Sequence, residues 1–519
     1  MSYKIKKISP SLTERILIDT NSDEFWYGGC VMDGPVYPFN SDSNYSLEMI
    51  HLDTVNQAAP CYFSTQGRAI WSEDAFDLYV KNGKLEIVAK SDIYLYEDGT
   101  TLKDAQQVVA QKTFALGNMP PKEFFEMPQW NSWIELLYKQ NEVDILKYAN
   151  GIVENGFPAG IIMIDDLWAD YYGRWKFSVR KFPHAKETVQ KLHDMGFKVM
   201  LWVCPFITPD TEEYHFLRDN DMLIKSKDGE PVIRKWWNGY SAILDLSYPK
   251  AYEWLKNELL ELQNDFGVDG FKFDAGDPRF YSNEDLSYMN LTALEHVELW
   301  SAFGLEFPFN EYRVNFKNQG APLVNRLQDK RFEWGKGGLS ELIPSSLTQG
   351  LLGYYYSCPD MIGGGEYLSF LEKQELDQEL IVRSAQCSAL MPMMQFSVAP
   401  WRVLDKEHLD LCKKAAELHV EFSDYIIQLA KNAAVTGQPI VRPMNYEYPE
   451  SDLKYSKTQF MLGEDFLVAP VLEKGATKKE IYFPEGKWSS IHNEREIIEG
   501  PVTMSVDANL SILPVYKKA

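Results

Sequence analysis

The stretch PKAYEWLKNELLELQNDFGVDGFKFDAG, residues 249–276, decides the fold class. Its first part is an amphipathic helical segment that ends in Gly267, the residue type expected at a helix C-cap. A short apolar strand, GFKFDAG at 270–276, follows almost directly. The same alternation of strands and longer helices runs from about 127 to 445, which indicates an α/β fold with a parallel sheet.

Eight short apolar segments in this region are candidate strands. They are QWNSWIE (129–135), GIIMIDD (160–166), KVMLWVCP (198–205), GFKFDAG (270–276), PLVNRLQD (322–329), LGYYYSCPD (352–360), MPMMQFSV (391–398) and PIVRPM (439–444). Eight strands suit a closed (β/α)8 TIM barrel better than an open sheet.

The two ends of the chain have a different pattern. Short alternating segments, separated by Asn, Asp, Gly and Pro turns, are typical of strands there. We therefore expect an N-terminal β-sandwich at 1–125, a catalytic barrel at 126–445 and a C-terminal β-domain at 446–519.

Composition excludes several classes of function. The chain has 75 acidic and 52 basic residues, a net charge of −23, which disfavours nucleic acid as a partner. It has no apolar run long enough for a membrane span and no signal-peptide core at its start, so we expect a cytoplasmic protein. Six cysteines without a C-x-x-C pair indicate buried thiols. Homo-oligomers, organism and pathway stay open.

Polar and charged side chains gather where the predicted strands end, which is where barrel enzymes place their active sites. These residues are Asp165, Asp166, Trp168, Trp202, Lys272, Asp274, Arg326, Asp329 and Asp360. A single Asp at such a position is explained by helix capping, but five together are not.

Acids and aromatics around one barrel mouth favour glycoside hydrolysis, which needs two carboxyl groups beside the scissile bond. Only eight histidines occur, none in a paired metal-binding motif, and the Gly-rich MIGGGEY (361–367) lacks the Lys of a phosphate-binding loop. We expect no metal and no cofactor.

Four segments resemble glycoside hydrolase family 31. GFKFDAGD (270–277) resembles the nucleophile segment, LQDKRFEW (327–334) the acid/base segment, YYYSCPDMIGG (354–364) the next strand end, and TQFMLGEDFLVAPVLEKGATKKEIYFPEGKW (458–488) the β-domain after the barrel. Within the family, IRKWWNGYSAILDLSYPKA (233–251), LIPSSLTQGLLGY (342–354) and MPMMQFSVAPWR (391–402) are most similar to the subgroup of the myogenesis-regulating glycosidase and bacterial α-galactosidases.

The resemblance implies roles for individual residues. Asp274 stands at the position of the nucleophile and Asp329 at that of the acid/base. Asp165 and Asp166 match acids that bind sugar hydroxyls, and either Arg313 or Arg326 matches the substrate-binding arginine. The further candidates for sugar contacts are Trp130, Trp133, Trp168, Trp202, Trp236, Trp237, Asn238, Lys272 and Asp360.

Two positions depart from the family pattern. Ser397 replaces a histidine that contacts the sugar in α-glucosidases, and Asp277 replaces the usual glutamate three residues after the nucleophile. The resemblance thus implies a retaining exo-α-glycosidase that acts on terminal, non-reducing α-linked sugars, α-galactosides first. An α-glucosidase, an α-xylosidase, an N-acetyl-α-galactosaminidase and a non-catalytic carbohydrate-binding protein are the alternatives, and transglycosylation stays open.

Overall fold

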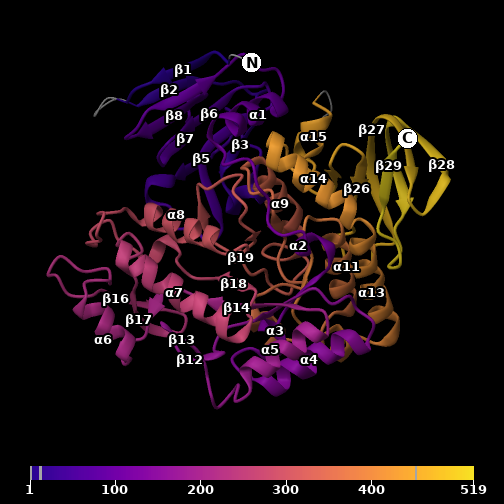
Figure 1. The fold of residues 1–519 in the computed structure, drawn as a ribbon. Helices are drawn as coiled ribbons and strands as arrows, with labels where there is room; N and C mark the ends of the chain where they lie inside the picture. Colours follow the sequence, from indigo (N-terminus) through magenta and orange to yellow (C-terminus); the bar gives the residue numbers. More distant parts are fainter. Residues whose placement is uncertain (1–2, 11–14, 450–452) are drawn as a thin grey trace.

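The computed structural model describes residues 3–10, 15–449 and 453–519 (Figure 1). In Figure 1 the indigo N-terminal sheets lie above the barrel, and the yellow C-terminal strands lie beside it. The exact boundaries between these three regions stay predictions.

Within the described residues, eight parallel strands form the barrel. Their order is β22 (Ser357–Cys358), β21 (Asn325–Arg326), β19 (Phe309–Tyr312), β18 (Gly270–Phe273), β14 (Lys198–Val203), β11 (Ile161–Ile164), β10 (Gln129–Asn131) and β23 (Gln395–Phe396). A parallel bridge between Met361 and Gln395 joins the two ends of this sheet and nearly closes the barrel. The predicted barrel architecture is confirmed.

Helices cover the outside of the barrel (Figure 1). They include α4 (Glu142–Glu154), α5 (Ala185–Asp194), α7 (Pro249–Phe266), α8 (Ala293–Phe303), α9 (Leu342–Leu351), α11 (Gln378–Ala389) and α13 (Lys406–Glu421). Gly267 ends α7 with a φ of 79°, a left-handed conformation that glycine adopts without steric cost. The Gly signal in the sequence therefore marks a true helix end.

One predicted strand was wrong, and one strand was missed. PIVRPM contains β24 (Val441–Arg442), which pairs with β25 (Phe460–Leu462) in the C-terminal sheet, outside the barrel. The missing barrel strand is β19, with the sequence FNEY. Its Asn310 and Glu311 are buried, so polar side chains stand where an apolar run is expected.

The N-terminal region contains two sheets that share one hydrophobic cluster with the barrel. The first contains β1 (Ile5–Ile8), β9 (Ile93–Tyr96), β6 (Ala69–Ser72), β5 (Gln57–Ser64) and β3 (Trp26–Cys30), and the second β2 (Ile16–Asp19), β8 (Lys84–Ala89), β7 (Phe76–Lys81) and β4 (Ser46–Glu48). A barrel segment, β20 (Asn315–Phe316), pairs in parallel with β5. This pairing anchors the N-terminal sheets beside the ends of the barrel strands.

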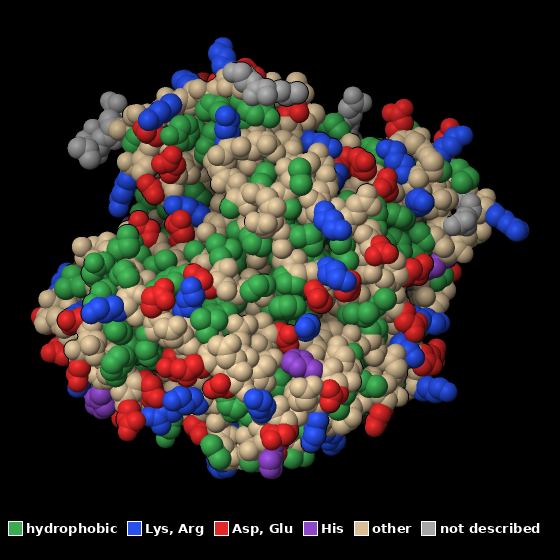
Figure 2. All heavy atoms as spheres, viewed as in Figure 1, with side chains coloured by type: hydrophobic (Ala, Val, Ile, Leu, Met, Phe, Trp, Pro, Cys, Tyr) green, Lys and Arg blue, Asp and Glu red, His purple; other side chains and the backbone are tan. Residues whose placement is uncertain are grey.

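The C-terminal sheet contains β24, β25, β26 (Phe466–Val468), β29 (Val515–Lys518), β27 (Lys478–Ser490) and β28 (Asn493–Asp507). Acidic and basic side chains are interspersed over the face of the molecule in Figure 2. Among the described helices, none combines the length and the apolar character that crossing a membrane requires. All six cysteines lie in the described part and are buried as free thiols.

Candidate active site

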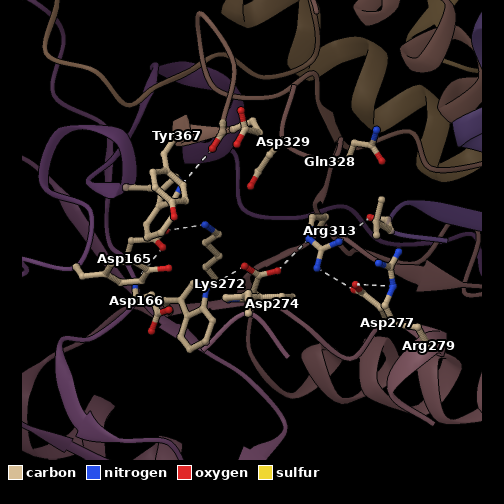
Figure 3. A pocket seen from close by; sticks show the side chains of 17 residues that line it. Asp165, Asp166, Lys272, Asp274, Asp277, Arg279, Arg313, Gln328, Asp329 and Tyr367 are labelled. Atoms are coloured by element: carbon tan, nitrogen blue, oxygen red, sulfur yellow. Dashed lines mark hydrogen bonds and ion pairs between the residues drawn. The ribbon is translucent and has the colours of Figure 1, made fainter. Parts of the chain in front are cut away.

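A pocket of about 390 Å³ opens where the barrel strands end (Figure 3). Of the residues predicted for the site, Asp165, Asp166, Trp133, Trp202, Trp237, Lys272, Asp274, Arg313 and Asp329 line it. The barrel thus brings together side chains that are up to 196 residues apart in the sequence (329 − 133 = 196).

Asp274, directly after β18, is held in a fixed orientation. The indole Nε1 of Trp202 donates to its Oδ2 at 3.0 Å, and the backbone N–H of Ala275 and Nε of Arg313 donate to its Oδ1 at 2.8 and 3.0 Å. Ala275 has a φ of 56°, a left-handed conformation that is uncommon outside glycine and that turns the chain sharply here.

The charge of Asp274 is stabilised by cations. Burial by itself raises the pKa of this carboxyl, but the charges of Arg313, Lys272 and Arg326 outweigh burial and hold the pKa well below its usual range. Asp274 is therefore ionised at neutral pH and can act as a nucleophile.

Arg313 holds the Asp274 side of the pocket in place through hydrogen bonds to three residues. Besides Asp274, its Nη2 donates to Oδ1 of Asp277 at 2.8 Å and its Nη1 donates to the carbonyl of Val55 at 3.0 Å. Arg326, the rival substrate arginine, is 1% exposed and does not line the pocket. Of the two candidate arginines, Arg313 therefore lines the pocket and Arg326 does not.

The far wall consists of an ion pair and a second carboxyl (Figure 3). Nζ of Lys272 donates to Oδ2 of Asp165 at 2.6 Å, and both side chains are almost fully buried. Asp166 accepts from the hydroxyl of Tyr172 at 3.1 Å and from the side-chain amide of Asn238. Burial, together with the charge of Asp165, raises the pKa of Asp166 to about 7. Asn238 does not itself line the pocket and acts on it through Asp166.

Asp329, after β21, faces the pocket from the side opposite Asp274 (Figure 3). Its side chain is 40% exposed, and its Oδ1 accepts from Nη1 of Arg326 at 2.8 Å. Asp360 shares the same Arg326 nitrogen at 2.8 Å, but it is 1% exposed and lies outside the pocket lining. The two predicted catalytic carboxyls, Asp274 and Asp329, thus differ in exposure and in their hydrogen-bond partners.

Three of the candidate tryptophans lie in the core. The ring of Trp130 stacks on Phe396 at 4.7 Å, Trp168 donates to the carbonyl of Trp202 at 2.7 Å, and the ring of Trp236 lies 4.4 Å from that of Phe206. These three residues do not line the pocket, because they are packed between strands and loops. Trp237, 47% exposed, lies at the rim in the turn between β16 (Ile233–Trp236) and β17 (Gly239–Ile243).

Several lining residues were not among the predicted sugar-binding residues. They are Val55, Tyr138, Asp277, Arg279, Gln328, Gly365, Glu366 and Tyr367. Glu366 and Tyr367 belong to the Gly-rich MIGGGEY segment, whose position directly after a predicted strand was the available signal. Val55 belongs to the N-terminal region, and nothing in its local sequence connects it to the barrel.

Two further features of the described chain bear on the chemistry. Ser397, which replaces the family's histidine, is buried and accepts a hydrogen bond from the backbone N–H of Ile134 at 2.7 Å, so it does not line the pocket. No group of three or more His, Cys, Asp or Glu side chains in the described ranges is arranged to hold a metal ion.

Comparisons with known proteins found matches for the barrel and for the C-terminal sheet. Residues 117–326 match the model of the glycosyl hydrolases family 31 TIM-barrel domain, and residues 437–519 match the family 31 C-terminal domain. The myogenesis-regulating glycosidase of Mus musculus is 34% identical over 389 residues, which are 72% of this chain and 54% of the relative. The alpha-glucosidase 2 of Bacillus thermoamyloliquefaciens is 24% identical over 82% of this chain and 56% of the relative.

The chain therefore spans about half the length of these curated relatives. Among solved structures, the GH31 dextranase of Flavobacterium johnsoniae complexed with glucose superposes with a TM-score of 0.86 at 22% identity, covering 97% of this chain and 66% of that one. At this level of identity, the likeness supports the fold.

Proposed function

The chain belongs to glycoside hydrolase family 31, and we propose that it is a retaining exo-α-glycosidase that hydrolyses terminal α-linked sugars, α-galactosides in particular. One observation carries the proposal: Asp274 and Asp329 face one pocket from opposite sides, in different environments. Glycoside hydrolysis by retention uses two carboxyls, one as nucleophile and one as acid/base.

In the first step, the carboxylate of Asp274 attacks the anomeric carbon and Asp329 donates a proton to the leaving oxygen. Trp202, Ala275 and Arg313 hold the two oxygens of Asp274, so little reorganisation precedes the attack. The product is a glycosyl ester of Asp274. In the second step, Asp329 takes a proton from water, which attacks the same carbon and releases the sugar with net retention.

The remaining lining residues account for sugar binding. The ion pair of Asp165 and Lys272, together with Asp166, presents acceptors and a donor to sugar hydroxyls. Trp202 and Trp237 present aromatic surface to the apolar faces of the ring. Val55 and Arg279 extend the rim beyond the barrel strands, which supports binding at a chain end.

The galactoside specificity is supported by the motifs of the subgroup and by Ser397, which replaces the histidine of α-glucosidases. A panel of 4-nitrophenyl α-galactoside, α-glucoside, α-xyloside and N-acetyl-α-galactosaminide tests it. Release from the galactoside alone is expected. Release from another glycoside keeps the mechanism and changes the specificity, and binding without release from any of them favours a carbohydrate-binding protein.

Asp274→Asn tests the mechanism. The variant keeps the shape of the side chain but has no nucleophilic carboxylate, so we expect kcat to fall by a factor of about 10⁴ or more with little change in melting temperature. Asp269→Asn is the matched control, because Asp269 lies at the other end of β18 and pairs with His193 and Lys198 outside the pocket. Turnover by Asp274→Asn close to that of Asp269→Asn would refute the assignment.

A further inference from the structure

Arg326 joins a pocket carboxyl to the interior of the barrel. It lies at the end of β21, is 1% exposed, and its Nη1 donates to Oδ1 of Asp329 and to Oδ1 of Asp360, both at 2.8 Å. On its other side, Nε lies 3.4 Å from Oε1 of the buried Glu311. Buried carboxyls on both sides fix the orientation of the planar guanidinium. The hydrogen bond from this guanidinium in turn fixes the orientation of the Asp329 carboxyl.

Asp360 also holds two backbone segments that lie beside Asp329. Its Oδ2 accepts from the backbone N–H of Lys330 at 2.7 Å and from that of Gly365 at 3.1 Å. Its own φ is +128°, a conformation that residues other than glycine rarely adopt. Such strain persists only where the surroundings over-determine it, and it is common beside functional groups.

Gly365 completes the enclosure of Asp329. A Cβ at this position would lie 2.6 Å from Oδ1 of Asp329 and 2.6 Å from Cε of Met361, which is closer than real Cβ atoms approach. The Oδ1 side of Asp329 is therefore enclosed by Arg326 and by the backbone that Asp360 holds. No hydrogen bond to Oδ2 of Asp329 occurs within the described part of the chain, and the side chain is 40% exposed to the pocket.

We propose that Asp360, which does not line the pocket, is the positioning residue for Asp329: through Arg326 and two backbone N–H groups it fixes Oδ1 as an acceptor and leaves Oδ2 to carry the catalytic proton. A guanidinium only donates, so the oxygen that faces it accepts a hydrogen bond and carries no proton of its own toward it. The proton that passes to the leaving oxygen is therefore bound to Oδ2. The inference rests on the proposed function, in which Asp329 is the acid/base.

The test separates proton donation from the rest of the reaction. An alkoxide needs a proton in order to leave, whereas fluoride leaves with little help, so methyl α-galactoside and α-galactosyl fluoride differ in their need for Asp329. The quantity to compare is kcat/KM, because it reports the steps up to the first irreversible one, before the second use of Asp329. If the panel selects glucosides, the corresponding α-glucosyl pair is used.

Asp360→Asn is the first variant. The amide nitrogen of Asn is a donor, so the side chain cannot accept both from Arg326 and from the two backbone N–H groups. We expect kcat/KM to fall by about 100-fold or more on methyl α-galactoside and by less than about 5-fold on the fluoride. Gly365→Ala, which displaces Asp329 directly and leaves Asp360 intact, should show the same selectivity and keeps the test valid if Asp360→Asn does not fold.

Glu24→Gln is the matched control, since Glu24 is a buried carboxyl that pairs with Arg68 in the N-terminal region. It should change the two substrates by the same factor. Equal losses on both substrates in folded Asp360→Asn and Gly365→Ala would overturn the inference. Turnover of the fluoride by Asp274→Asn would instead refute the proposed function, so the two failures are distinguishable.

Discussion

At the scale of single residues, Arg313 joins two carboxylates of the pocket to the N-terminal region. It donates to the proposed nucleophile, to Asp277 and to the carbonyl of Val55. Although burial raises the pKa of Asp274, Arg313 is the first of the cations that lower it below its usual range. A depressed pKa keeps the nucleophile ionised in acid, and this benefit is lost as the pH falls through the folded-state pKa.

Arg313→Gln should therefore lower kcat/KM by about 100-fold at the optimum and move the acid limb of its pH profile to higher pH, because Asp274 then takes up a proton sooner. A pH–rate profile with the best glycoside of the panel measures both effects. Arg402→Gln removes an exposed arginine that pairs with Glu135 outside the pocket, and it should leave the profile unchanged. An unshifted acid limb in Arg313→Gln would contradict the electrostatic role.

At the scale of elements, β18 lies so close to β19 that its first residue, Gly270, has no room for a side chain. A Cβ on Gly270 would lie 2.0 Å from the carbonyl oxygen of Phe309 in β19, and backbone cannot move aside as a side chain can. Gly270→Ala should destabilise the protein by at least about 1–3 kcal/mol and reduce activity, because β18 carries Lys272 and leads into Asp274.

Thermal unfolding checks this expectation, with Gly335→Ala as the control, since a Cβ on Gly335 meets nothing within 4 Å. The prediction fails if both variants melt at the same temperature.

The polar residues of β19 explain why this strand escaped sequence analysis. Its Glu311 is buried because Gln395 donates to it at 2.7 Å and Arg326 lies beside it, and neither partner is near in sequence. A polar residue that tertiary partners satisfy has no local signature.

At the scale of the whole molecule, the sequence predicted the pocket residues that lie on or directly after barrel strands. It missed the residues that reach the pocket from another region of the chain. Asp165, Lys272, Asp274 and Asp329 were found because each follows or belongs to an apolar strand. Trp130 and Trp168 share that pattern but pack in the core, since strand position fixes the end of the barrel and not the direction of a side chain. The position of Val55 in the pocket lining depends on how the N-terminal sheets dock, which no local pattern encodes.

That docking should itself support catalysis. Gln57 of β5 is fully buried, and its side-chain amide donates to the carbonyls of Arg313 and, at 3.0 Å, of Arg326, while its Oε1 accepts from Gln349 of α9 at 2.8 Å. One N-terminal side chain thus holds the backbone of both arginines that contact the two proposed catalytic carboxyls. Removing it leaves buried carbonyls without partners, which costs about 1–3 kcal/mol.

Gln57→Ala should therefore lower the melting temperature and also reduce kcat/KM by about 10-fold or more, because a small misplacement of catalytic groups is expensive. Gln66→Ala, an exposed position just beyond the same strand, should change neither quantity. If Gln57→Ala loses stability but keeps full kcat/KM where it is folded, the N-terminal sheets only brace the barrel. If both fall together, the active site is shared between the two regions, and neither region is a complete catalytic unit.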